Sequence, residues 1–360
     1  MSKTEVQWPL QRKSGAAGFV SYFVNEGLPR TATKSLPAKD TKDSRRTLRS
    51  AGLRLLFGLL CDFGLGCLQY AGYPMKVFVL LFLILTFAAV PCLADHPEWT
   101  TPIASFKISG NLYYVGSRDL AAYLVVTPAG NILINANLES SPPLIRRSVE
   151  QLGFRWSNTK ILLNSQAHYD HSAGAAEVLR ETHAQYMVMD GDVDAIQSGG
   201  ASDFDQSISH FPRARVDRTL HDNDTVTLGG TTLTAHKTAG HTRGCTTWTM
   251  ETQEGGRTLH VVIVGGWAAN PGVRLVVRDG KPASYPGIAS DFDKTFATLK
   301  ALPCDIFLGA HGVYFDMLSK VERMPNEGAA VWIDPQGYGK AVAEHEADYR
   351  EEFAKQQQPR

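Results

Sequence analysis

The sequence predicts an α/β domain in which two sheets pack face to face with helices outside them. Runs rich in apolar and β-branched residues, separated by Gly, Asp and Pro turns, occur in two successive groups, and each group is accompanied by helical stretches. An apolar content of 43% with 36 basic and 36 acidic residues argues against a wholly disordered chain, a nucleic-acid coat and a polytopic membrane protein. Histidines also follow strand ends in three places, where a rigid sheet can present ligands.

The first group is expected to start as an antiparallel meander and to continue with alternating helices and strands. Its strand runs alternate with turn residues, and its helices carry apolar residues at helical spacing. We predict strands at 112–115, 123–127, 131–135, 160–164 and 185–189, and helices at 143–152 and 173–181. Residues 191–205 are polar and rich in Gly, Ser and Asp, which indicates a helix and a long surface loop.

The second group repeats the pattern with longer strands. We predict strands at 225–228, 231–236, 245–252, 258–264 and 304–308, and helices at 292–302 and 341–356. The chain has no low-complexity run and no short repeat of solenoid period. Residues 95–360 therefore suit one globular domain, for which the sequence indicates a monomer.

The segment 75–94 reads as a secretory signal peptide. Lys76 is followed by 18 uncharged residues that end in small side chains before Ala94, where cleavage is expected. A transmembrane anchor is the alternative, because 18 uncharged residues just reach the length that crosses a bilayer. The signal peptide is favoured because the run has no charged stop, and it implies a periplasmic protein without stable membrane association after cleavage.

A signal peptide that begins at Met75 makes residues 1–74 a suspect N-terminal extension, upstream of the expected start of translation. This extension holds 11 basic and 5 acidic residues, a charge of +6, whereas residues 95–360 hold 24 and 31, a charge of −7. The mature domain would be acidic and would keep two cysteines, Cys245 and Cys304. Their spacing alone does not decide whether they form a disulfide.

The residues suited to chemistry lie in three segments that each follow a predicted strand. His168, Asp170 and His171 lie within four residues in segment 164–174, His241 lies in segment 238–244, and His311 lies in segment 308–312. Imidazole and carboxylate are typical zinc ligands, and an open coordination position would make such a site catalytic. A single histidine is usually a surface or capping residue, but their joint occurrence predicts a metal site.

Other polar residues in the same region are interpreted as supporting or structural residues rather than as metal ligands. His236 lies inside a strand five residues before His241, so we interpret it as a hydrogen-bond partner of a ligand rather than as a ligand. Asp190, Asp192 and Asp194 are most simply a helix start with a solvated face.

These motifs carry a family resemblance. His-x-Asp-His after a strand, with a later Gly-His-Thr and Ala-His-Gly, resembles the metallo-β-lactamase superfamily over residues 100–355. The details are most similar to the third subclass of class B β-lactamases, and to its GOB-type branch, because Gln166 stands where most relatives have the first histidine. The resemblance implies a four-layer αββα sandwich and a small-molecule β-lactam substrate, with no nucleic-acid partner.

The resemblance also implies a ligand set and a mechanism. One or two Zn²⁺ ions would be held in two sites, the first made of Gln166, His168 and His241, and the second of Asp170, His171 and His311. An amide oxygen is a weaker zinc ligand than imidazole, so we expect the second site to fill first. Asp170 would orient a metal-bound hydroxide toward the β-lactam carbonyl, and the activity would confer antibiotic resistance.

Two departures from relatives bear on the substrate. Many hydrolases of esters, thioesters and lactones in the superfamily carry a bridging aspartate at the end of one strand. In this chain the end of that strand corresponds to residues 261–267, which contain no carboxylate. Hydrolysis of such a substrate remains the alternative, and a non-enzymatic metal-binding protein is a third reading. Where the subclass often has a small hydroxyl residue the chain has Gly266 and Trp267, so Trp267 is a candidate to line the pocket. The choice among β-lactam classes is left open.

Overall fold

The computed structural model describes residues 4–10, 18–24, 96–205 and 210–358. The chain divides into two compact units, Met1–Pro91 and Cys92–Arg360. In the first unit, β1 (Thr4–Leu10) and β2 (Gly18–Val24) pair as an antiparallel ladder, where the sequence predicted no element. The predicted signal peptide at 75–94 lies outside the described residues. Among the helices that are described, none has both the length and the apolar character needed to cross a membrane.

The first sheet of the second unit has seven strands in sequential order. They are β3 (Phe106–Ser109), β4 (Leu112–Tyr114), β5 (Tyr123–Thr127), β6 (Gly130–Ile134), β7 (Thr159–Leu163), β8 (Gln185–Met189) and β9 (Arg218–Leu220). Strands β3 to β6 form the predicted antiparallel meander, and β6 to β9 run parallel. The sequence prediction missed β3 and β9, because edge strands of four and three residues leave little alternation to detect.

The second sheet has five strands, also in sequential order. They are β10 (Asp224–Leu228), β11 (Thr231–Lys237), β12 (Thr246–Glu254), β13 (Arg257–Val264) and β14 (Ile306–Gly309). Neighbouring strands are antiparallel except for β13 and β14, which run parallel because a helix connects them.

Seven α-helices and four short 3₁₀-helices are described in this unit. The α-helices are α3 (Pro142–Gln151), α4 (Tyr169–Ser172), α5 (Ala175–Thr182), α6 (Val193–Ser198), α7 (Ile288–Ala301), α8 (Met317–Glu327) and α9 (Pro335–Gln357). The 3₁₀-helices are η1 (Pro97–Trp99), η2 (Trp156–Asn158), η3 (Gly312–Phe315) and η4 (Gly328–Trp332). The predicted helix 173–181 begins earlier, as α4, and is interrupted at Gly174, where a Cβ atom would lie 2.3 Å from the Ala136 carbonyl oxygen. Helix α8 was not predicted from the sequence.

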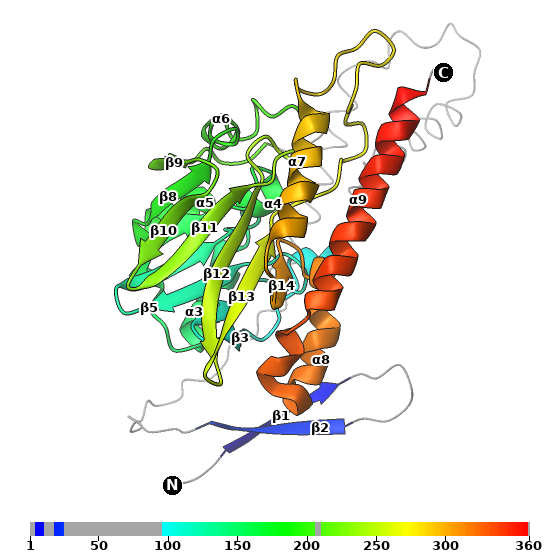
Figure 1. Ribbon diagram of the computed structural model, residues 1–360. Helices are drawn as coiled ribbons and strands as arrows, with labels where there is room; N and C mark the ends of the chain where they lie inside the picture. Colours follow the sequence, from blue (N-terminus) through cyan, green and yellow to red (C-terminus); the bar gives the residue numbers. More distant parts are fainter. Residues whose placement is uncertain (1–3, 11–17, 25–95, 206–209, 359–360) are drawn as a thin grey trace, which may run out of the picture. The chain divides into compact units, whose positions relative to one another are not determined.

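Figure 1 shows the sheets and the helices as layers, and two apolar clusters pack between them. Between the sheets, Tyr123 and Leu163 of the first sheet belong to one buried cluster with Trp248 of the second. That cluster continues into α7 and α9, where the rings of Phe292 and Tyr349 stack with centroids 5.0 Å apart. The other cluster packs α3, α5 and α6 on the outer face of the first sheet. The predicted four-layer sandwich of helices, sheet, sheet and helices is confirmed.

The two sheets are joined by hydrogen bonds at the edge where β7 and β14 end. The Thr246 amide donates to the Ser165 carbonyl at 2.8 Å, which links the loop after β7 to the start of β12. The Ala121 amide donates to the Ala310 carbonyl at 2.9 Å, which links the start of β5 to the end of β14. Loops from both sheets therefore converge at this edge, and they carry the predicted metal ligands.

Candidate metal centre

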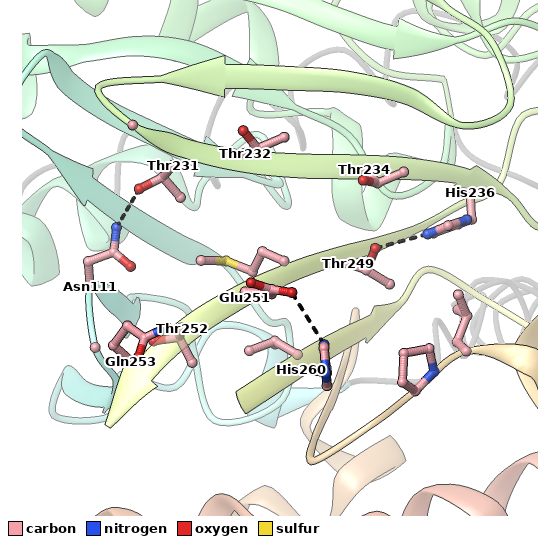
Figure 2. Close-up of a pocket in the computed structure, with 16 residues that line it drawn as sticks. Asn111, Thr231, Thr232, Thr234, His236, Thr249, Glu251, Thr252, Gln253 and His260 are labelled. Atoms are coloured by element: carbon pink, nitrogen blue, oxygen red, sulfur yellow. Dashed lines mark hydrogen bonds and ion pairs between the residues drawn. The ribbon is translucent and has the colours of Figure 1, made fainter. Parts of the chain in front are cut away.

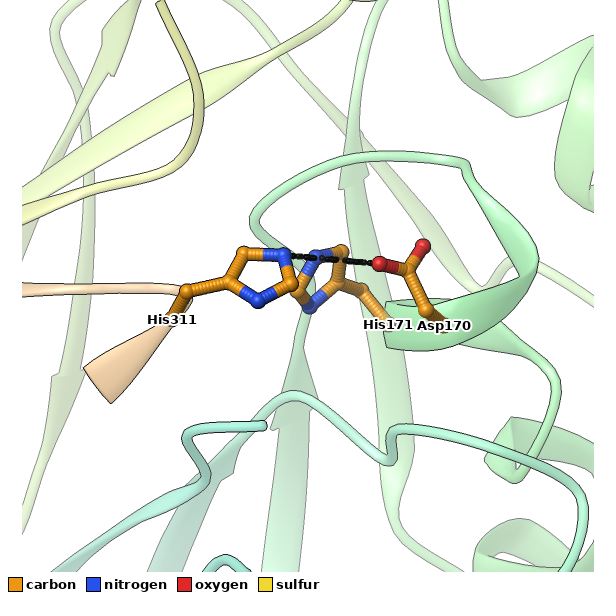
Figure 3. Close-up of side chains that lie close together, drawn as sticks. All are labelled: Asp170, His171 and His311. Atoms are coloured by element: carbon orange, nitrogen blue, oxygen red, sulfur yellow. Dashed lines mark hydrogen bonds and ion pairs between the residues drawn. The ribbon is translucent and has the colours of Figure 1, made fainter. Parts of the chain in front are cut away.

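Three of the predicted ligands meet in one compact group, shown in Figure 3. Asp170 Oδ2 lies 3.3 Å from His171 Nε2 and 3.4 Å from His311 Nε2, and the two imidazole nitrogens lie 3.2 Å apart. Two ligands on one tetrahedral zinc, each at about 2.0–2.1 Å, stand about 3.3–3.4 Å from each other. The donor atoms, their spacing and their chemistry therefore fit one zinc ion.

The loop after β7 owes its shape to buried polar side chains. Asn164 Nδ2 and Ser172 Oγ both donate to the Gln166 carbonyl oxygen, at 2.7 Å and 2.8 Å. The Asn135 side-chain oxygen accepts from the Ser165 amide at 2.9 Å, and Asn135 adopts a left-handed backbone conformation with φ of 67°. These bonds hold the chain that leads into α4, whose single turn presents Asp170 and His171.

Gln166, His168 and His241 form a second group beside the first. Gln166 is buried, and its Nε2 donates to the Gly265 carbonyl at 3.4 Å. Within the part of the chain that is described, the Gln166 Oε1 and His168 Nε2 atoms are buried and have no hydrogen-bond partner. The rings of His168 and His241 have centroids 4.7 Å apart. An amide oxygen and an imidazole nitrogen that are buried without partners are atoms that a bound cation would satisfy.

The loop after β13 leaves room for His241 because it contains glycine. A Cβ atom on Gly266 would lie only 2.6 Å from His241 Cδ2. On the other side of the ring, the Nδ1 atom of His241 lies 2.7 Å from the Ala268 carbonyl oxygen. This contact orients the imidazole and assigns its Nδ1 as the protonated nitrogen, which leaves Nε2 available as a ligand atom.

A carboxylate that the sequence analysis missed supports His311. Asp119 Oδ2 lies 2.9 Å from His311 Nδ1 and accepts from Trp99 Nε1 at 3.1 Å, while Oδ1 accepts from the Val313 amide at 3.0 Å. Metal-binding histidines commonly donate their second ring N–H to such a carboxylate. Asp119 is 192 positions from His311 in the chain, so spacing could not reveal the pair. The available signal was an aspartate directly before the apolar run 120–126.

Burial and neighbouring charges shift the pKa values of these groups in different directions. Burial, with a contribution from His241, lowers the pKa of His168 to about 3, so its imidazole is neutral at pH 7 and able to bind a metal. Burial opposes charge on His311 as well, but Asp119 and Asp170 outweigh it and raise the pKa of His311 to about 9. Burial also acts against ionisation of Asp170, yet the adjacent His171 and His311 hold its pKa well below the usual value.

The structure places His236 away from both groups. His236 lies on β11, its Nε2 is 2.9 Å from Thr249 Oγ1, and it lines a pocket of about 810 Å³, shown in Figure 2. Side chains alternate along a strand, and Leu233 and Ala235 take the buried face, so His236 points to the other face. Its hydrogen bond goes to a neighbouring strand, whereas we had predicted a bond to a ligand.

Trp267 lies beneath the site. Only 1% of its surface is exposed, and its ring stacks on His345 of α9 with centroids 4.2 Å apart. The Tyr314 ring lies 5.1 Å from Trp267 and 5.2 Å from His311, measured between centroids. Trp267 is therefore a packing residue behind Tyr314, and its burial leaves it little surface to offer to a substrate.

Cys245 and Cys304, whose pairing the sequence left open, are both free thiols.

The prediction that Asp190, Asp192 and Asp194 form a helix start with a solvated face is wrong for Asp192. Asp192 is 2% exposed and buries its carboxylate against the His241 loop, with Thr242 Oγ1 donating at 2.8 Å and the Gly244 amide at 2.7 Å. Burial raises the pKa of Asp192 to about 7. The prediction failed because the loop that covers Asp192 lies 50 residues away in the chain.

Comparison with known proteins agrees with this fold and geometry. The family model described as the metallo-beta-lactamase superfamily matches residues 118–311. The FEZ-1 metallo-beta-lactamase from Legionella gormanii is 47% identical, covers 71% of this chain and 97% of its own, and gives a TM-score of 0.68. BJP-1, a subclass B3 enzyme of Bradyrhizobium japonicum, is 34% identical over 72% of this chain and 97% of its own, with a TM-score of 0.66.

GOB-18 from Elizabethkingia meningoseptica is 36% identical, covers 72% of this chain and 96% of its own, and gives a TM-score of 0.67. Its overall identity is below that of FEZ-1, so the resemblance to the GOB-type branch depends on Gln166 rather than on identity along the chain. The sandwich of two sheets, the converging histidine loops and these matches together confirm the predicted family: the chain belongs to the metallo-β-lactamase superfamily, among structural neighbours of subclass B3.

Proposed function

We propose that this protein is a zinc-dependent β-lactamase that opens the β-lactam amide bond of penicillins, cephalosporins or carbapenems. The observation that carries the proposal is the triangle of Asp170, His171 and His311, whose atoms fit one zinc ion. FEZ-1 and GOB-18, which share the fold over nearly their whole length, are metallo-β-lactamases.

Zinc is assigned to two positions, with one or two ions per chain. Asp170, His171 and His311 form the tighter site, because a carboxylate and two imidazoles are stronger donors than a neutral amide. Gln166, His168 and His241 form the weaker site, supported by the unpartnered Oε1 of Gln166 and Nε2 of His168 among the described residues. We therefore expect the Asp170 site to fill first.

The chemistry divides between the metal and the protein. Zinc, when bound, lowers the pKa of a coordinated water to about 7 and so makes a nucleophile available at neutral pH. Asp170 stays ionised because its pKa is held low, and its carboxylate can accept a hydrogen bond that orients the attacking water. Asp119 and the Ala268 carbonyl hold the rings of His311 and His241 in place. No side-chain nucleophile is needed, and Ser172 instead supports the loop after β7.

A panel of substrates tests this proposal. The full-length protein, with and without added zinc, is assayed on nitrocefin, a penicillin and a carbapenem, and in parallel on ester, thioester and lactone substrates. We expect zinc-dependent β-lactam hydrolysis that disappears after dialysis against a chelator. Activity confined to the esters would favour the alternative hydrolase, and activity that survives chelation would refute a zinc mechanism.

Two histidine variants make the panel sharper. His311→Ala removes a proposed ligand and is expected to lower β-lactam hydrolysis by two or more orders of magnitude, which corresponds to about 3 kcal/mol or more in the barrier. His236→Ala is the matched control, since His236 lies on the outer face of β11 and contacts Thr249. Equal losses in the two variants would count against the assignment of His311.

We also propose export to the periplasm, with residues 75–94 as the signal peptide and residues 1–74 as an extension upstream of the true start. Sequencing the N-terminus of the protein from its native host tests this proposal. A mature protein that starts near Asp95 supports it, whereas residues from before Met75 in that protein would contradict it. Export to this compartment would let the enzyme protect the cell from β-lactam antibiotics.

A further inference from the structure

Asp192 lies between the two loops that carry the proposed weaker zinc site. It follows β8 and precedes α6, and its carboxylate accepts from Thr242 Oγ1 at 2.8 Å and from the Gly244 amide at 2.7 Å. A hydrogen bond from the Ala167 backbone reaches the same carboxylate. Thr242 follows His241 directly, so one carboxylate is bonded to the loops of both imidazole ligands in this site.

The backbone around Asp192 packs directly on the His241 loop. A Cβ atom on Gly191 would lie 2.6 Å from the Arg243 carbonyl oxygen, and one on Gly244 would lie 2.6 Å from the Asp192 amide nitrogen. Both positions therefore require glycine for this close approach of two chains. Just before them, Asp190 forms an ion pair with Lys237 at 2.7 Å, at the point where β11 leads into the same loop.

The position of Asp192 in the chain suggests that its carboxylate caps helix α6, but it does not. Asp192 is the residue before the first turn of α6, yet its side chain makes no capping bond to that helix. The carboxylate instead bonds to the loops at 167 and 242–244. A buried carboxylate is costly unless it is well bonded, so this arrangement points to a role in holding those loops.

We propose that Asp192 is a positioning residue that sets the spacing between the Gln166–His168 loop and the His241 loop. It would thereby tune the affinity of the weaker zinc site without touching the metal. The inference rests on the ligand set proposed above. The physical reason is that a zinc ligand shifted by more than about 0.2 Å leaves the range of good coordination, and Asp192 bonds to the residues next to two ligands.

The test is a zinc titration of metal-free protein against a chromophoric chelator, with thermal unfolding of the metal-free protein measured alongside. For Asp192→Ala we expect affinity at the weaker site to fall about 10-fold to 100-fold, while the tighter site changes by less than about threefold. Asp192→Asn keeps an acceptor for the Gly244 amide, so its zinc affinity at the weaker site should lie between that of Asp192→Ala and that of the wild type. Asp194→Asn, an exposed aspartate two residues further on, is the matched control and should titrate as the wild type does.

Wild-type zinc affinity at both sites in Asp192→Ala would overturn the inference. So would an equal loss at both sites with a lowered melting temperature, since that outcome describes general destabilisation. If Asp192→Ala does not fold, Thr242→Val removes one bond to the carboxylate and is expected to weaken the same site to a smaller degree. Gln166→Ala separates the two proposals: loss of the weaker zinc supports the ligand set, whereas retention of both ions would refute that set and not only the role of Asp192.

Discussion

Gly266→Ala should weaken zinc binding at the weaker site while leaving the fold and the tighter zinc in place. The added Cβ atom would lie 2.6 Å from His241 Cδ2, 2.9 Å from Cγ and 3.3 Å from Cβ. Carbon atoms pack at about 3.5–4.0 Å, so the ring must retreat by about 0.9 Å or more. That displacement is more than four times the tolerance of about 0.2 Å for a zinc ligand. We expect at least a 10-fold to 100-fold loss of affinity at the His241 site.

The assay counts zinc ions by competition with a chelator and follows unfolding of the metal-free protein. Overpacking against the ring should lower stability by about 1–3 kcal/mol, which the domain can tolerate. Gly339→Ala is the matched control, because its Cβ atom would have nothing within 4 Å and neither glycine has a left-handed backbone conformation. A Gly266→Ala protein that binds two zinc ions with wild-type affinity would refute the reasoning.

Three other substitutions test the remaining contacts. Asp119→Asn replaces the carboxylate that holds His311 and should weaken the tighter zinc site about 10-fold to 100-fold in the same titration; unchanged affinity would show that the contact is dispensable. Gln166→His should tighten the weaker site, because imidazole binds zinc better than an amide, and a looser site would contradict the ligand assignment. Asp334→Asn removes an ion pair with the buried Lys320, whose ammonium lies 2.8 Å from the Asp334 carboxylate, while an amide can still cap α9. Burial opposes ionisation of Asp334, but Lys320 outweighs it and lowers the pKa. The native state therefore binds fewer protons than the unfolded state near this pKa. The free energy of unfolding of the wild type should exceed that of the variant by about 1 kcal/mol above pH 4. This difference should vanish as the pH falls below the lowered pKa of Asp334. Melting temperatures of both metal-free proteins between pH 2.5 and 7 check this, and a difference that persists at the acid end would disprove it.

Much of the fold could be predicted because its strands and helices have strong local patterns. The prediction placed β5 and β8 at their observed bounds, and the observed α7 overlaps most of the predicted helix 292–302. Strands β3 and β9 and helix α8 escaped prediction, since short or amphipathic elements at the edge of the fold depend on packing with distant residues. The long helix α9 starts before the predicted 341 because Asp334 accepts from the Gly337 amide and Pro335 suits the first turn.

The sequence by itself determined which residues could hold a metal, because the His-x-Asp-His segment and the two later histidines combine the donors that zinc binds with positions at strand ends. Only the tertiary structure decided which partners hold those ligands. Asp119 reaches His311 across 192 residues, and Asp192 reaches Thr242 across 50. It also placed His236 on the outer face of its sheet and Trp267 in the core. Local patterns encode periodicity and donor chemistry, whereas the close approach of two loops depends on how the sheets pack, which no short stretch of sequence contains.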